Sequence, residues 1–117
     1  MLRILVVLPL YGGSLPIGRY CVTGLRESGC LVDVFEAPSF HPAMEALKDL
    51  KVSSERLDSL QNAFLQNISQ AILAQAESFE PALVLCLPQA PMPRLALQRL
   101  PQYRIPPALW FFQNLRL

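Results

Sequence analysis

The chain has 117 residues, 52% of them apolar and 16% charged, and its ten basic and nine acidic residues leave a net charge of +1. This length fits one domain with its own hydrophobic core, and a charged fraction below the roughly 25% of typical domains indicates buried strands rather than disorder. The near-neutral charge argues against a nucleic-acid partner, and no apolar run approaches the roughly 18 residues that cross a membrane.

The beginning of the chain has the pattern of a strand, a helix and a second strand. Residues 4–8 are continuously apolar, which is typical of a strand covered on both faces of a parallel sheet. A helix is predicted next, ending near Gly29, and Gly24 is expected to let that helix approach the sheet closely. Residues 30–35 are rich in β-branched and aromatic side chains and predict the second strand. The apolar face of the helix is predicted from residues at helical spacing: Ile17, Tyr20, Cys21, Gly24 and Leu25.

The rest of the chain continues the alternation of helices and strands. Ser53 is the predicted N-cap of the longest element, a helix that Pro81 stops near residue 80. The other predicted elements, in chain order, are a loop at residues 36–42, a short helix at 43–50, a strand at 82–87, a proline-flanked helix at 93–100 and a strand at 107–112.

This order of elements predicts a single α/β domain over residues 1–117, with a doubly wound parallel sheet between two layers of helices. The long connection after the second strand carries the chain back past the first, so the expected strand order is 2-1-3-4. Ligands of such sheets bind beyond the carboxyl ends of the strands, at the point where the strand order reverses. The loops at residues 9–14 and 88–91 meet there.

The turn formed by Gly12, Gly13 and Ser14 is the main candidate site, with Gln89 expected across the cleft. The two glycines permit positive φ and close backbone approach just before a helix N-terminus, where free N–H groups favour a phosphate or sugar. A tight turn without a ligand is the alternative. Because the G-x-G-x-x-G spacing and a P-loop lysine are both absent, classical NAD and ATP sites are not expected. Replacing Gly13 with valine is expected to impair ligand binding.

Four further polar residues lie in or near the predicted loops. His41 is a candidate general base or an ordinary loop histidine, and Glu36 either reaches a hydroxyl group or is solvated. Asn114 and Gln89 each follow a predicted strand, where their amides would bind a sugar or ribose or would satisfy backbone groups. Arg19 is expected on the solvated face of the first helix.

The three cysteines, Cys21, Cys30 and Cys86, follow no metal-ligand spacing, and an odd number cannot pair completely within one chain. We expect them to be free, buried thiols that bind no metal, in a reducing cytoplasmic setting. The short apolar start lacks a small-residue cleavage site and does not fit a signal peptide.

Four segments of the sequence carry a family resemblance. They are R-I-L-V-V-L-P-L-Y-G-G-S at residues 3–14, G-L-R-E-S-G-C-L-V-D-V-F-E at 24–36, F-E-P-A-L-V-L-C-L at 79–87 and A-L-W-F-F-Q-N-L-R-L at 108–117. Together they resemble the N-terminal half of GT-B glycosyltransferases, and in particular the amino-terminal domain of CgeB-like bacterial proteins.

The resemblance implies one half of a two-domain enzyme. In GT-B enzymes two Rossmann-like domains face each other; the N-terminal domain mainly holds the acceptor and the C-terminal domain most of the nucleotide-sugar donor. By this resemblance, the turn at Gly12 and Gly13 lines the cleft between the domains, and no position matches a catalytic base. We therefore expect a glycosyltransferase domain that needs a C-terminal Rossmann-like partner domain, contains no cofactor itself and transfers no sugar alone.

Two alternatives belong to other functional classes. A non-catalytic Rossmann-like binding or assembly domain would form a homodimer through the edge of the fourth strand, where Trp110 and Phe112 lie. A receiver-like signalling domain is disfavoured, because an acidic pair is expected after its first strand and Pro9, Leu10 and Tyr11 stand there instead.

Overall fold

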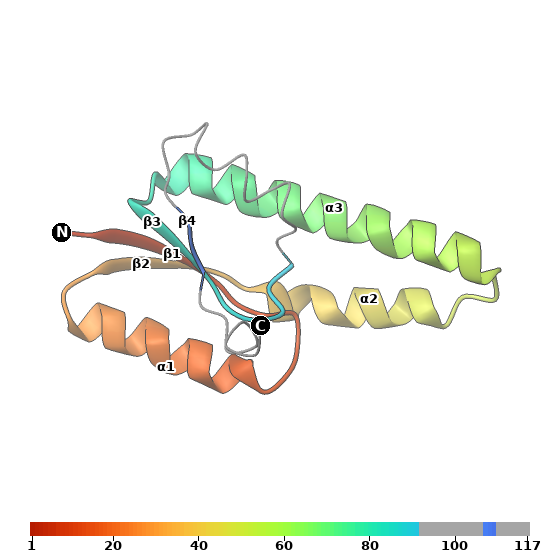
Figure 1. Ribbon diagram of the computed structural model, residues 1–117, viewed down its shortest axis with the longest axis horizontal. Coiled ribbons are helices and arrows are strands. Elements are labelled where there is room, and N and C mark those ends of the chain that lie inside the picture. The colour runs from red at the N-terminus through yellow and green to blue at the C-terminus, as the bar shows by residue number, and fades with distance from the viewer. Residues whose placement is uncertain (92–106, 110–117) are drawn as a thin grey trace.

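The computed structural model describes residues 1–91 and 107–109, which form a parallel sheet with helices packed against it (Figure 1). The strands lie in the order β2-β1-β3-β4, and each neighbouring pair is parallel. Their bounds are β1 Arg3–Val7, β2 Leu31–Phe35, β3 Leu83–Cys86 and β4 Pro107–Leu109. The predicted α/β architecture with a parallel sheet is confirmed, its strand order is the predicted one, and it is compatible with a Rossmann-like fold.

Three α-helices and one 3₁₀ helix connect the described strands: α1 Ser14–Glu27, η1 Ala37–Phe40, α2 His41–Lys48 and α3 Ser54–Phe79. The prediction of a loop at residues 36–42 is wrong, because η1 and the start of α2 occupy this segment. Each of these two helices has a proline at its first or second position, where the missing N–H has no helical partner to lose.

The ends of α3 agree with the sequence prediction. The Ser53 side chain accepts a hydrogen bond from the backbone N–H of Arg56 at 3.2 Å, which satisfies one of the free donors of the first turn. At the other end Glu80 adopts the left-handed conformation, with φ of 53°, directly before Pro81. With 26 residues, α3 is the longest described element.

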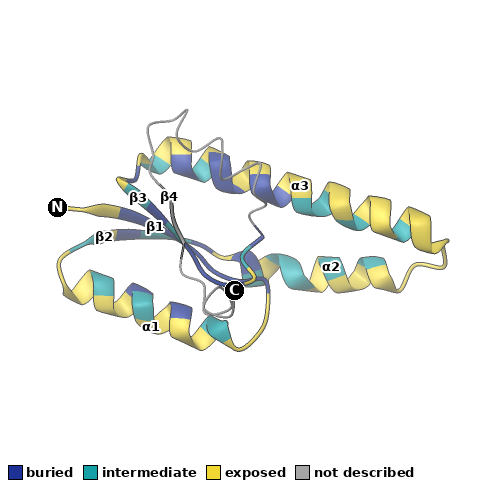
Figure 2. Cartoon of the chain, viewed as in Figure 1, coloured by how far each residue is buried: buried dark blue, intermediate teal, exposed yellow. Residues whose placement is uncertain are grey.

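The two faces of the sheet carry separate hydrophobic clusters (Figure 2). On one face, the carboxyl-terminal half of α3 packs its buried side chains on alternate residues of the strands. This cluster consists of Leu5, Val7, Leu10, Phe35, Ala37, Ile68, Ile72, Leu73, Ala76, Val84 and Cys86. The other face, beneath α1, is built on Ile4, Val6, Leu8, Val22, Val32 and Leu87.

The orientation of α1 differs from the prediction. Gly24 is exposed, and Ile17 and Tyr20 of the predicted apolar face are 38% and 78% exposed. The glycine that faces the sheet is Gly18, where a Cβ atom would lie 2.8 Å from Cδ2 of Leu8. The close approach of helix and sheet therefore exists, but at a position six residues earlier than expected.

The helix predicted at residues 93–100 and the end of the fourth strand, residues 110–112, lie outside the described residues. Among the helices that the structure does describe, none combines the length and the apolar character that crossing a bilayer requires.

Candidate functional site

The loops after β1 and β3 meet at the carboxyl edge of the sheet, as their positions in the chain predict. The backbone N–H of Leu10 donates to the carbonyl of Gln89 at 3.3 Å, and the Ser14 hydroxyl donates to the carbonyl of Pro88 at 3.1 Å. These two bonds join residues more than seventy positions apart in the chain. Ser14 also begins α1, so the junction lies directly at the N-terminus of that helix.

Gly12 and Gln89 are in direct contact at this junction. Gly12 has φ of +107°, and a Cβ atom there would overlap Oε1 of Gln89. Gln89 itself has φ of 68°, a conformation that costs energy for a residue with a side chain. A positive φ and a lack of space thus both select glycine at position 12, and this backbone approach places the Gln89 amide against the turn.

Gly13 does not share these constraints. Its φ is −71° in the right-handed helical region, and a Cβ atom would meet nothing within 4 Å. Of the two glycines that permit positive φ, Gly12 therefore adopts it and Gly13 does not. Its role as a ligand contact stays a prediction, but a valine there would act by filling open space beside the turn rather than by straining the backbone.

His41 lies close to the same turn through its neighbour Tyr11. The centroids of the two rings are 5.2 Å apart, and Nε2 of His41 is 3.1 Å from Oε1 of Glu45. Lys48 donates to the same carboxylate oxygen, and these two neighbours, Lys48 first, hold the pKa of Glu45 below its usual value. The histidine is thus held by a carboxylate beside an aromatic ring that is half exposed. Its use as a general base stays a prediction, and Asn114 lies outside the described residues.

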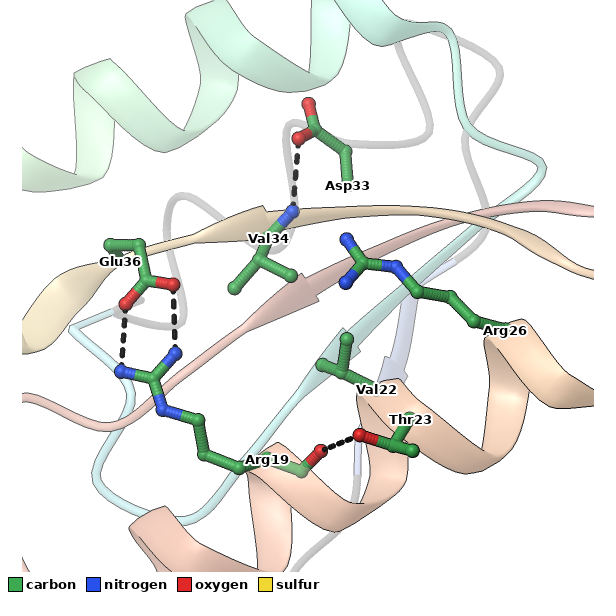
Figure 3. Close-up of a pocket in the computed structure, with 7 residues that line it drawn as sticks. All are labelled: Arg19, Val22, Thr23, Arg26, Asp33, Val34 and Glu36. Atoms are coloured by element: carbon green, nitrogen blue, oxygen red, sulfur yellow. Dashed lines mark hydrogen bonds and ion pairs between the residues drawn. The ribbon is translucent and has the colours of Figure 1, made fainter.

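A second feature, which the sequence analysis missed, lies between α1 and β2 (Figure 3). It is an open pocket of about 280 Å³. The guanidinium of Arg19 donates to both carboxylate oxygens of Glu36, at 2.8 and 2.9 Å. The lining residues are Arg19, Val22, Thr23, Arg26, Asp33, Val34 and Glu36.

The Arg19–Glu36 pair adds an interaction that the sequence analysis did not predict. Arg19 lies on the exposed face of α1, as predicted, and Glu36 is also exposed, but the two side chains bind each other, so Glu36 is not free to reach a hydroxyl group. The hydrogen bonds from Arg19 lower the pKa of Glu36, and those to Glu36 raise the pKa of Arg19. The second arginine, Arg26, donates to the carbonyl of Val32 at 3.1 Å. Both arginines of the pocket therefore already have hydrogen-bond partners, and the two carboxylates of the lining, Asp33 and Glu36, balance their formal charge.

The cysteines are free thiols, as predicted, but only Cys86 is buried, while Cys21 and Cys30 are partly exposed. Loss of hydration raises the pKa of Cys86 to about 12, so its reactive thiolate form is scarce at neutral pH. The predicted burial of all three cysteines is wrong for the other two.

Comparisons of the chain with protein family models, with curated proteins and with solved structures find no match. The junction of the loops at Gly12 and Gln89 and the residues around it are therefore the basis for assigning a function.

Proposed function

We propose that this chain forms the N-terminal, acceptor-side domain of a GT-B-type glycosyltransferase of the CgeB-like kind. A second Rossmann-like domain would hold the nucleotide-sugar donor, and the chain would transfer no sugar alone because it positions only one of the two substrates. The observation that carries the proposal is the junction at the carboxyl edge, where the Gly12 backbone lies directly against the Gln89 amide.

The position of the junction supports a binding role. In a doubly wound sheet, the carboxyl ends of neighbouring strands at the reversal of strand order are where ligands bind, and β1 and β3 are such neighbours. The helix α1 begins in the same place, at Ser14. Among its first three residues, Leu15 donates its N–H to the carbonyl of Gly12 at 3.3 Å and Pro16 has no N–H, so the Ser14 N–H and the helix dipole are what this end offers to a ligand. Such a terminus favours partial negative charge by about 0.3–1 kcal/mol at exposed sites. A phosphate or a sugar hydroxyl is therefore preferred there over a cation.

The surrounding side chains fit a sugar acceptor. The Gln89 amide offers both a donor and an acceptor for hydroxyl groups. Tyr11 presents an aromatic ring that is 54% exposed, which can pack on the apolar face of a sugar ring while its hydroxyl stays in water. His41, held by Glu45 and in contact with Tyr11, is the candidate base for deprotonating an acceptor hydroxyl.

Titration of the ¹⁵N-labelled chain tests this proposal, with UDP-glucose, glucose and inorganic phosphate as separate probes. We expect amide shift changes at Gly12, Gly13, Ser14 and Gln89, and stronger changes for probes that carry phosphate. Gly12→Ala should weaken this response, because the new Cβ displaces the Gln89 amide, and should cost roughly 1–3 kcal/mol of stability through its positive φ.

Gly24→Ala is the matched control, since Gly24 is an exposed glycine of α1 with nothing within 4 Å of a new Cβ. It should leave the titration unchanged. Shift changes confined to the amino-terminal edge of the sheet would contradict the assignment of the site. If no probe perturbs any amide, the alternative of a non-catalytic assembly domain is favoured instead.

A further inference from the structure

One edge of β2 has no neighbouring strand in the described sheet, because β2 is the terminal strand on that side and pairs with β1 alone. The N–H of Leu31 donates to Leu2 and the carbonyl of Phe35 accepts from Leu8, so these residues direct their peptide groups toward the β1 side. Peptide groups alternate in direction along a strand. The N–H and C=O groups of Val32 and Val34 therefore point away from the sheet, toward any strand that would add there.

Side chains already occupy three of these four outward groups. Arg26 of α1 donates to the carbonyl of Val32 at 3.1 Å, and the N–H of Val34 donates to Oδ1 of Asp33 at 3.0 Å. Gln75 of α3 donates to the carbonyl of Val34 at 3.3 Å and to Oδ2 of Asp33 at 2.9 Å. Figure 3 shows that Arg26 reaches β2 from α1 and that Asp33 lies on the side of α3. Side chains from the helices on both faces of the sheet thus form hydrogen bonds with the backbone of this edge.

We propose that Arg26, Asp33 and Gln75 close the β2 edge against pairing with a second copy of this chain. An exposed edge strand is a template for addition of another strand, and proteins avoid this by blocking the edge with polar or charged side chains. Here the block consists of hydrogen bonds to the edge backbone itself, made by one residue from each of α1, β2 and α3.

The geometry of the excluded dimer explains why the block is effective. In an antiparallel pairing of two β2 strands about a twofold axis at Asp33, Val32 of one copy would face Val34 of the other and the pair would form four backbone bonds. Each copy would first lose its three side-chain bonds to the edge, so more bonds break than form. The Asp33 carboxylates would also meet across the axis, and like charges directly opposite each other destabilise a strand pair.

Removing the three side chains tests the proposal. The triple variant Arg26→Ala, Asp33→Ala, Gln75→Ala should dimerise with an association constant about tenfold or more above that of the wild type, as expected for edge groups left free to bond between copies. Sedimentation velocity over a concentration series measures the association. Amide hydrogen exchange then locates it, because the N–H of Val32, the one outward group that these side chains leave unoccupied, should become protected in the variant dimer.

A matched control separates edge pairing from nonspecific association. The variant Arg56→Ala, Asp58→Ala, Gln70→Ala loses the same three residue types from exposed positions of α3, and its association should equal that of the wild type. If the triple edge variant fails to fold, the single variants Gln75→Ala and Arg26→Ala test the same point. Each frees one edge carbonyl and should raise the association constant by less than the triple variant. Equal association of the edge variants and the control would overturn the proposal, and so would protection of the Val32 N–H that increases with concentration in the wild type.

Discussion

The two faces of the sheet are built in different ways. Against one face, α3 places large side chains: Ile72 is fully buried, and Ile68 and Leu73 are nearly so. Against the other, the buried residues of α1 are Gly18 and Val22, and the helix backbone approaches Leu8 and Leu87 at the glycine. The α3 layer is thus held by side-chain volume and the α1 layer by close backbone approach, so removing volume should destabilise the α3 face and adding volume should destabilise the α1 face.

The largest expected effect belongs to the α3 face. Replacing Ile72 with alanine leaves a cavity in the core between α3 and the sheet and should lower the free energy of unfolding by about 2–5 kcal/mol, measured by urea denaturation. Leu60→Ala on the same helix is the control, because Leu60 is 40% exposed and should cost much less. Equal losses at the two positions would contradict the burial that distinguishes the two halves of α3.

On the α1 face, adding side-chain volume should lower the stability of the fold. Gly18→Val would place a Cβ 2.8 Å from Cδ2 of Leu8 and 3.3 Å from Cγ of Leu87, and should destabilise the fold by about 1–3 kcal/mol. Gly24→Ala on the same helix meets nothing within 4 Å and should stabilise by roughly 0.5–1 kcal/mol through reduced backbone entropy. Thermal or urea unfolding measures both changes, and a stabilising Gly18→Val would exclude close approach at this position.

The difference between the two faces also explains what could be predicted from the sequence. The continuous apolar runs of the strands and the cap at Ser53 are local signals, and they identified β1, β2, β3 and α3 within one or two residues. The buried face of α1 is not a local property, since Ile17 and Tyr20 have helical spacing yet point outward. Packing against Leu8 and Leu87 selects the side on which a glycine allows approach, and no periodicity of apolar residues records this.

The candidate site likewise combines features that the sequence predicts with features that depend on distant contacts. A topological rule placed Gly12, Ser14 and Gln89 together, because strands on either side of a reversal bring their following loops to one edge. Which glycine has positive φ depends on contact with Gln89, 77 positions away, and could not be read from the turn alone. The pairing of Arg19 with Glu36 depends likewise on the register between α1 and β2, although the helical spacing of Arg19, Val22 and Arg26 was visible in the sequence.

The Arg19–Glu36 pair should have the smallest effect, because it ties only the outer side of α1 to the end of β2 and both side chains are about half exposed. Exposed ion pairs contribute about 0.2–1 kcal/mol. A double-mutant cycle with Arg19→Met and Glu36→Gln measures the coupling free energy of the pair, because the other effects of each single substitution cancel to a first approximation.

The coupling between Arg19 and Glu36 should also depend on pH. Because Arg19 lowers the pKa of Glu36 below its usual value of 4.5, the coupling should be fully present above that value and should disappear as pH falls through the lowered pKa. It should also weaken at about 1 M salt, where screening shortens the range of charge interactions. A coupling energy that stays the same from about pH 7 to about pH 2 would show that the pair does not depend on the Glu36 charge.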